Sequence, residues 1–204
     1  TLFENEERAE EIITYYKERI SKVEAVSEAV TQQEKPTALL LYYNERGGTV
    51  SFNVPPSSWM QTILVEKAGG IPVWKGEITG SGWTKVGIEQ IAAWDPDYIF
   101  ITSYFSSSEN AAEAVRENPI WKSIGAVRDG QLYAFPSDFY SWDQPDPRWL
   151  LGLLWIGKML HPGRLPTIDI MEEVERFYSV LYSLSQEQYR SAVLPVLEGD
   201  LNRK

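Results

Sequence analysis

Apolar residues recur at helical spacing over the first part of the chain. Between about residues 4 and 32 they fall every third or fourth position, at Ile12, Ile13, Tyr16, Ile20, Val23 and Val26. This spacing puts the apolar side chains on one face of a helix, and the glutamates at its start are favourable near a helix N-terminus. We therefore predict one long helix, followed by a polar run.

Short apolar runs then alternate with helical patterns. Runs rich in strand-forming residues occur at 37–43, 49–53, 71–74, 98–101 and 131–135. Helical patterns occur at about 59–68, 87–94, 109–117, 147–160, 168–184 and 185–197. This alternation predicts an α/β fold whose sheet is mainly parallel, flanked by helices and joined by right-handed crossovers.

Local signals predict where several helices begin and end. Ser58 and Gln61 have the spacing of a capping box before the helix at 59–68, and Gly69-Gly70 follows it. Asp146 precedes Pro147, which suits a helix cap followed by a proline at the first helical position. Residues 95–97, Asp-Pro-Asp, end the helix at 87–94 before the next strand.

Composition and charge exclude several classes of function. The formal net charge of -10 argues against a nucleic-acid partner, because a phosphate backbone attracts clustered Lys and Arg. The chain contains no cysteine and one histidine, His161, for which we expect a structural role. Zinc or Ser-His-Asp chemistry therefore lacks sufficient groups, and no dinucleotide or phosphate-loop motif is present.

Candidate functional residues lie in loops that follow the predicted strands. In open α/β sheets, ligands bind beyond the carboxyl ends of the strands, and the loops there span 44–48, 103–108 and 137–146. They carry Arg46 and several aromatic residues, which suit a large, flat or partly apolar ligand. Packing of these rings against the core is an equally good interpretation. Asp143 and Asp146 suggest carboxylate chemistry or a cation site, although capping is the favoured role of Asp146.

The sequence also resembles a known family. Residues 83–101, WTKVGIEQIAAWDPDYIFI, are similar to a pattern in substrate-binding proteins of ABC importers for iron-siderophores, haem and corrinoids. The resemblance extends to ERAEEIITYYKERI, TALLLYYNERGGTVSF, KAGGIPVW, NPIWKSIGAVRDGQLYAF, DPRWLLGLLWIGKMLHP and EEVERFYSVLYSLS, in the family's order. It implies a long interdomain helix at residues 1–36 and the C-terminal α/β ligand-binding lobe at 37–204. The family's N-terminal lobe, which carries its own Glu-bearing helix, has no counterpart here.

The resemblance also implies site residues. Trp83 matches an aromatic residue that faces the ligand in corrinoid-binding relatives, and Glu89 matches an acidic residue that contacts arginines of the membrane permease. Tyr140 and Trp142 lie in a loop that faces the cleft. Loop position alone suggests Arg46, Trp59 and Tyr104 as further ligand-binding residues, and Arg46 suits a carboxylate or catecholate of the ligand.

The implied function is a non-enzymatic one without a cofactor. The chain is expected to capture a metal chelate, foremost an iron-siderophore with haem or a corrinoid as alternatives, and to deliver it to an ABC permease outside the cytoplasm. Tyr104 or Tyr140 would be the axial ligand if the chelate were haem. Two alternatives remain open, an enzyme or cofactor domain of the nitrogenase or chelatase type, and a structural interaction domain in which Trp83, Tyr140 and Trp142 are packed.

Overall fold

The computed structural model describes residues 5–165 and 167–201. The helices are α1 (Glu6–Ala29), α2 (Met60–Lys67), α3 (Ile88–Trp94), α4 (Ser108–Glu117), α5 (Gly125–Arg128), α6 (Trp149–Leu160), α7 (Ile170–Tyr182) and α8 (Gln186–Gln188). The strands are β1 (Thr37–Arg46), β2 (Thr49–Val54), β3 (Ile71–Pro72), β4 (Thr84–Val86), β5 (Tyr98–Thr102) and β6 (Leu132–Ala134). Short irregular helices, η1 (Trp121–Ser123), η2 (Tyr189–Val193) and η3 (Leu194–Val196), complete the described part of the chain.

The strands form one mixed sheet that is mostly parallel, as predicted. Its order is β4-β2-β1-β5-β6, with β3 also paired to β1. The pairs β1–β3, β1–β5 and β5–β6 are parallel, whereas β1–β2 and β2–β4 are antiparallel. Strand β4 was not predicted from the sequence, because three residues at a sheet edge show no readable alternation.

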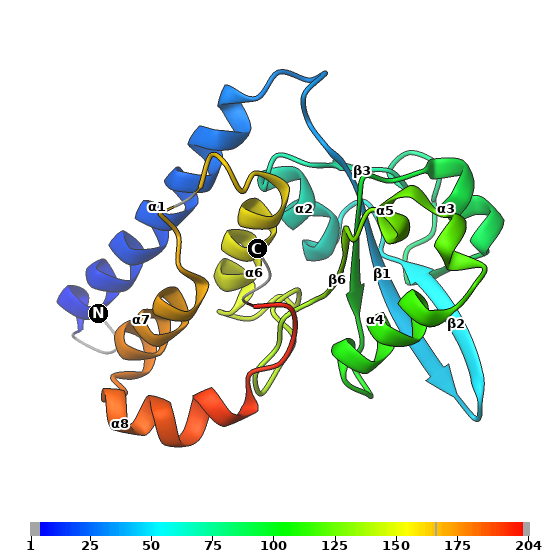
Figure 1. Cartoon of the computed structure of the whole chain (residues 1–204). Helices are drawn as coiled ribbons and strands as arrows, with labels where there is room; N and C mark the ends of the chain where they lie inside the picture. Colours follow the sequence, from blue (N-terminus) through cyan, green and yellow to red (C-terminus); the bar gives the residue numbers. More distant parts are fainter. Residues whose placement is uncertain (1–4, 166, 202–204) are drawn as a thin grey trace.

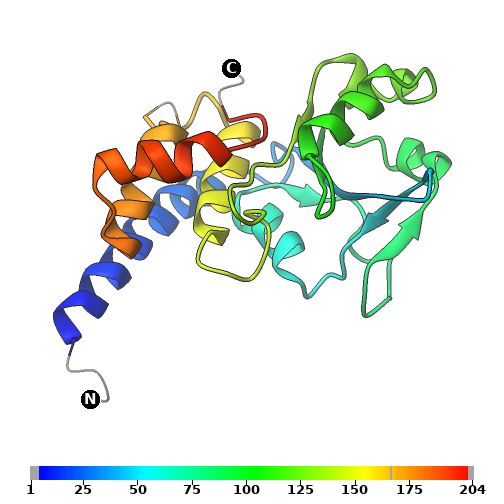
Figure 2. The same cartoon turned by 90° about the horizontal axis from the view of Figure 1, so that it is seen from below.

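Helices cover both faces of this sheet (Figures 1 and 2). Helices α4 and α5 lie on one face, and α2 and α6 lie on the other. Trp155 of α6 packs its ring against Phe100 and Phe135, with centroids 5.2 and 5.0 Å apart. Burial of these large rings makes α6 the centre of the core, and ten of its twelve residues are buried.

Helix α1 runs along the outside of the helical layer, against α6 and α7 (Figure 1). It lies within the predicted range of 4–32 and buries Tyr15, Arg19 and Val23. The guanidinium of Arg19 donates from Nε to Glu173 of α7 over 2.8 Å. This buried ion pair joins two helices from opposite ends of the sequence.

Some predicted helix ends differ from the structure. The capping box of Ser58 and Gln61 does not form, because Trp59 is the N-cap of α2 and no side chain caps it. The Gln61 amide is instead directed to Asp143. Asp146 accepts from the backbone N–H of Arg148, so it closes the turn just before α6. Gly69 has φ +85° and follows the end of α2, as predicted.

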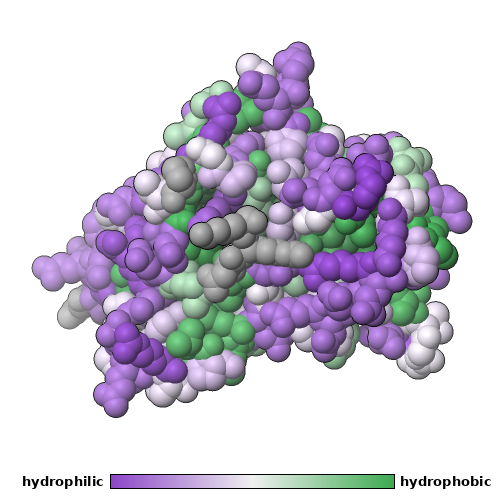
Figure 3. Space-filling model, viewed as in Figure 1, coloured by the Kyte–Doolittle hydropathy of each residue, from purple (hydrophilic) through white to green (hydrophobic). Residues whose placement is uncertain are grey.

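The face in Figure 3 is mainly hydrophilic, with hydrophobic residues in separate patches. None of the helices formed by residues 5–165 and 167–201 is both long and apolar enough to span a membrane.

Candidate functional site

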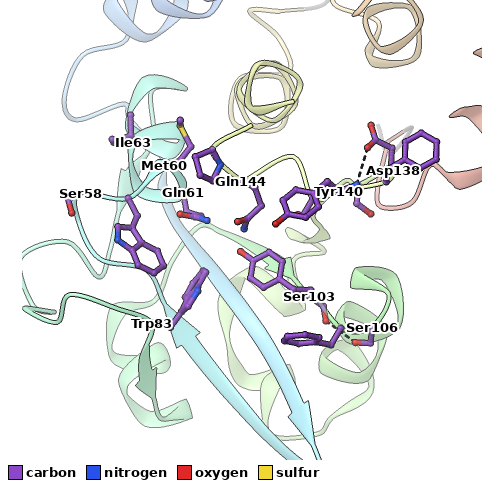
Figure 4. Close-up of a pocket in the computed structure, with 17 residues that line it drawn as sticks. Ser58, Met60, Gln61, Ile63, Trp83, Ser103, Ser106, Asp138, Tyr140 and Gln144 are labelled. Carbon is purple, nitrogen blue, oxygen red and sulfur yellow. Dashed lines mark hydrogen bonds between the residues drawn. The ribbon is translucent and has the colours of Figure 1, made fainter. Parts of the chain in front are cut away.

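A cavity of about 990 Å³ opens where four loops meet (Figure 4). One loop precedes α2, one carries Trp83 into β4, one follows β5, and one follows β6. The lining residues are Ser58, Trp59, Met60, Gln61, Ile63, Trp83, Ser103, Tyr104, Phe105, Ser106, Ser137, Asp138, Phe139, Tyr140, Ser141, Gln144 and Pro145. Because two loops leave the carboxyl ends of β5 and β6, the cavity lies where an open α/β sheet places its ligands.

Aromatic rings form one wall of the cavity. The ring of Trp83 lies 5.7 Å from that of Trp59, nearly perpendicular to it, and 6.0 Å from that of Tyr104. Trp83 also packs on Tyr42 of β1 at 5.2 Å, which fixes the wall to the central strand. Edge-to-face contacts of this kind hold the rings in place and leave open faces for a ligand.

The rim of the cavity exposes further aromatic side chains. Phe105, Phe139 and Tyr140 are 76%, 58% and 55% exposed. Figure 4 shows Trp83 and Tyr140 on opposite sides of the space, with Gln61 and Gln144 between them. Exposed apolar side chains gathered around a hollow are typical of a binding surface.

A buried carboxyl group lies behind this wall. Asp143 is fully buried, and its Oδ2 accepts from the Tyr104 hydroxyl at 2.5 Å, the Gln61 amide at 3.2 Å and the Gln144 amide at 3.4 Å. Its Oδ1 has no hydrogen-bond partner among the described residues. Burial raises the pKa of Asp143. Burial, followed by the adjacent carboxylate, raises the pKa of Tyr104.

A second carboxylate fixes the loop after β6. Asp138 accepts from Arg148 Nε at 2.6 Å, Tyr178 Oη at 2.8 Å and Trp142 Nε1 at 3.1 Å. It also accepts from the backbone N–H of Tyr140. These bonds anchor the loop to α6 and α7, so the position of Tyr140 depends on the helical layer.

Four of the six residues suggested for ligand binding line the cavity: Trp59, Trp83, Tyr104 and Tyr140. Trp142 does not, because it is fully buried and hydrogen-bonded to Asp138. Arg46 does not either. It is exposed at the end of β1, and its guanidinium lies 5.4 Å from the centre of the Phe105 ring.

Glu89 is exposed in the first turn of α3 and does not line the cavity. Trp83 and Glu89 lie on either side of the start of α3, and the short strand β4 separates Trp83 from that helix. His161 is buried beside Gly69, at the end of α6.

The sequence singles out Asp143 but does not predict the two amides beside it. The spacing of Ser58 and Gln61 favours a capping role for Gln61, and no pattern points to Gln144. The available signal was the polar Asp143-Gln144 pair in the same loop as Tyr140. The sequence could not show that Gln61, 82 residues away, meets this pair.

Comparison with known families agrees with this architecture. A family model described as periplasmic binding protein matches residues 1–139. The chain belongs to the periplasmic binding protein family. The family includes substrate-binding proteins of ABC importers, which agrees with the resemblance seen in the sequence.

Curated relatives of this family member differ in their ligands. The molybdate-binding protein MolA of Haemophilus influenzae is 25% identical over 131 residues, which cover 64% of this chain and 36% of MolA. The iron(3+)-hydroxamate-binding protein FhuD of Bacillus subtilis is 34% identical over 65 residues, covering 31% of this chain and 20% of FhuD. Both relatives are binding proteins, and the matched regions span about a third or less of their length.

A solved ABC transporter solute-binding protein from Sulfurospirillum deleyianum has the same fold. It superposes with a TM-score of 0.72 at 22% identity. The match covers 92% of this chain and 56% of that protein, so this family member spans just over half of the solved relative.

Proposed function

We propose that this chain forms part of the substrate receptor of an ABC importer, in which it captures a metal chelate. The chelate is foremost an iron-siderophore, with haem and corrinoids as alternatives. The receptor works outside the cytoplasm, in the periplasm or as a cell-surface lipoprotein, and it catalyses no reaction. Residues 1–36 correspond to the interdomain helix, and residues 37–204 to the C-terminal lobe.

The observation that carries this proposal is the aromatic cavity of a periplasmic binding protein family member. A volume of about 990 Å³ is at the upper end of the usual range for small-molecule sites. A metal chelate is large and partly apolar, so stacking on Trp83 and Tyr140 would remove much of its surface from water. The second lobe of a receptor would close over the open side of the cavity.

Glu89 is the proposed contact with the permease. Its carboxylate is exposed near the N-terminus of α3 and outside the cavity. An exposed carboxylate can pair with an arginine on a partner without disturbing the ligand site, and such contacts favour correct docking. Binding of the chelate and docking to the permease are thereby assigned to separate surfaces.

Glu89→Ala in the intact receptor tests this separation. We expect chelate uptake by cells to fall about tenfold or more, because removal of a paired charge at an interface costs roughly 2 kcal/mol or more. The affinity of the purified receptor for its chelate should stay unchanged. Uptake of the radiolabelled chelate and equilibrium titration measure the two quantities.

Glu187→Ala is the matched control, because Glu187 is also an exposed glutamate but belongs to α8. Its uptake should equal that of the unmodified receptor. Unchanged uptake in the Glu89→Ala receptor would refute the docking role. Loss of affinity and uptake together would show that Glu89 acts on the ligand site.

A further inference from the structure

The cavity has an unusual distribution of charge for a site that would hold an anion. Among the described residues, no Lys, Arg or His lines it, and Asp138 is the charged residue that does. The Asp138 carboxylate is fully buried and paired with Arg148, so it is already neutralised. A ligand entering from solvent therefore meets rings and neutral polar groups.

The nearby basic residues are directed elsewhere. Arg148 binds the carboxylates of Asp138 and Asp146. Arg46 lies over the ring of Phe105 and does not line the cavity. An oxyanion in this half of the cleft would lose hydration without gaining a cationic partner from it, and burial of an unpaired charge is costly.

The buried Asp143 carboxyl orients the two amides of the cavity. Gln61 and Gln144 both direct their Nε2 donors to Asp143 Oδ2. Because Asp143 Oδ2 accepts both bonds, it holds each NH₂ group on its own side and leaves each amide oxygen on the other. The Tyr104 hydroxyl is also committed as a donor to Asp143.

The aromatic wall favours the same kind of ligand. The faces of Trp83, Trp59 and Tyr104 carry partial negative charge, which attracts cations placed over the rings. Amide oxygens accept from N–H groups at the edge of a ligand. The ring faces thus suit a ligand with positive charge, and the amide oxygens suit a ligand with hydrogen-bond donors.

We propose that this cavity selects a large metal chelate that is neutral or positively charged and carries hydrogen-bond donors at its edge. It disfavours oxyanions and anionic chelates, in contrast to the molybdate-binding relative MolA. Gln61 and Gln144 determine this specificity, and Asp143 is a positioning residue for both. The inference rests on the proposed function, because it names the ligand class of the same site.

A matched ligand series tests the proposal on the receptor that contains this chain. Ferrioxamine B carries a protonated amine, its N-acetyl derivative is neutral, and its N-succinyl derivative carries a carboxylate, all on one iron-hydroxamate cage. The corrinoid aquacyanocobinamide, a cation, and molybdate extend the series. We expect the cationic and neutral members of at least one chelate class to quench the Trp fluorescence of the receptor. Molybdate should not change this fluorescence. If ferrioxamine B binds, its N-succinyl derivative should bind at least tenfold more weakly.

Gln144→Lys adds a cation beside the same wall. We expect this receptor to gain at least tenfold in affinity for N-succinyl ferrioxamine B and to lose affinity for ferrioxamine B. Gln144→Leu is the control of similar size without charge, and it should show no gain for the anion. Near-ultraviolet circular dichroism of each variant confirms that it is folded.

Binding of molybdate or of the N-succinyl derivative as tight as that of the cationic chelates would overturn the proposal. A folded receptor that binds no member of the series would also overturn the ligand class. Neither result would decide the transport role, which the uptake phenotype of Glu89→Ala tests separately.

Discussion

At the scale of single residues, Asp143 has an unusual environment. Its carboxyl group is fully buried, one oxygen accepts from three side chains, and the other has no partner. Burial without a paired cation disfavours the ionised form, which is why the pKa is raised. An ionisable residue is therefore kept at a cost to stability, as is common where a site needs fixed polar groups.

Asp143→Asn should change the dependence of stability on pH. The unfolded chain ionises Asp143 at about pH 3.9, whereas the folded protein holds the proton to higher pH. The free energy of unfolding therefore decreases as pH rises from the unfolded pKa to the folded pKa, and this loss persists above it. Asparagine cannot ionise, so the variant should gain stability relative to the unmodified protein over that interval. Urea denaturation between pH 4 and 8 measures the difference.

The exposed Asp129 provides the control for that titration. Asp129→Asn should show a difference of at most about 1 kcal/mol across the range, because it removes only a surface ion pair. A stability difference for Asp143→Asn that shrinks as pH rises would contradict the assignment.

Trp83→Ala should weaken chelate binding at least tenfold. The variant removes a large ring from the middle of the aromatic wall, and truncation of a central aromatic residue commonly costs about 2 kcal/mol. Titration of the receptor with ferrioxamine B and with aquacyanocobinamide measures the loss for whichever it binds. Ile120→Ala, which truncates a 62% exposed residue outside the cavity, should leave affinity unchanged. Equal affinity of the Trp83 variant and the unmodified receptor would remove Trp83 from the site.

The sequence located the aromatic loops but not the direction of each ring. Trp83 and Tyr140 line the cavity as expected, whereas Trp142, two residues after Tyr140, turns inward to Asp138. A loop has no repeating geometry, so spacing along it does not predict which side chains face outward. That direction depends on the buried carboxyl groups of Asp138 and Asp143, which accept hydrogen bonds from segments distant in sequence.

At the scale of elements, α6 and the loop after β6 approach each other unusually closely. Gly152 of α6 lies directly against the backbone carbonyl of Trp142, which leaves no space for a side chain. The helix therefore supports the loop that carries Tyr140 and Gln144. Glycine inside a helix is otherwise unfavourable by about 1 kcal/mol relative to alanine, so this close contact explains its presence.

Gly152→Ala should destabilise the protein by about 1–3 kcal/mol, because the added methyl group forces the helix and the loop apart. Thermal or urea unfolding measures this change. Gly163→Ala is the control, since a methyl group there meets no atom within 4 Å, and it should be nearly neutral. Increased stability of the Gly152 variant would mean that the loop moves away at little cost.

Elements with strong periodicity were the ones predicted well. Helix α1 and the buried strands β1 and β5 lie close to their expected bounds, because each buries a continuous apolar face. The short strand β4 and the small helices η1 and α5 lack such a signal. Their formation depends on pairing and packing with residues distant in sequence.

At the scale of the whole molecule, the family resemblance and the fold agree. A mostly parallel sheet with helices on both faces was expected from the alternation of patterns, and residues 1–139 match the family model. The cavity is formed by loops that are distant from one another in the sequence. Its polar interior therefore could not be read from any single stretch of sequence.

The position of α1 also has a consequence for how the protein is made. Arg19 is paired with Glu173, which lies 154 residues later in the chain, and Arg8 donates to the carbonyl of Val180. At roughly 5–20 residues per second, a ribosome needs about 8–30 seconds to synthesise that interval. During this time the apolar face of α1 has been made but its partner helix α7 has not. Helix α1 therefore stays undocked from α7 during this interval, and its exposed apolar face makes the nascent chain prone to aggregation.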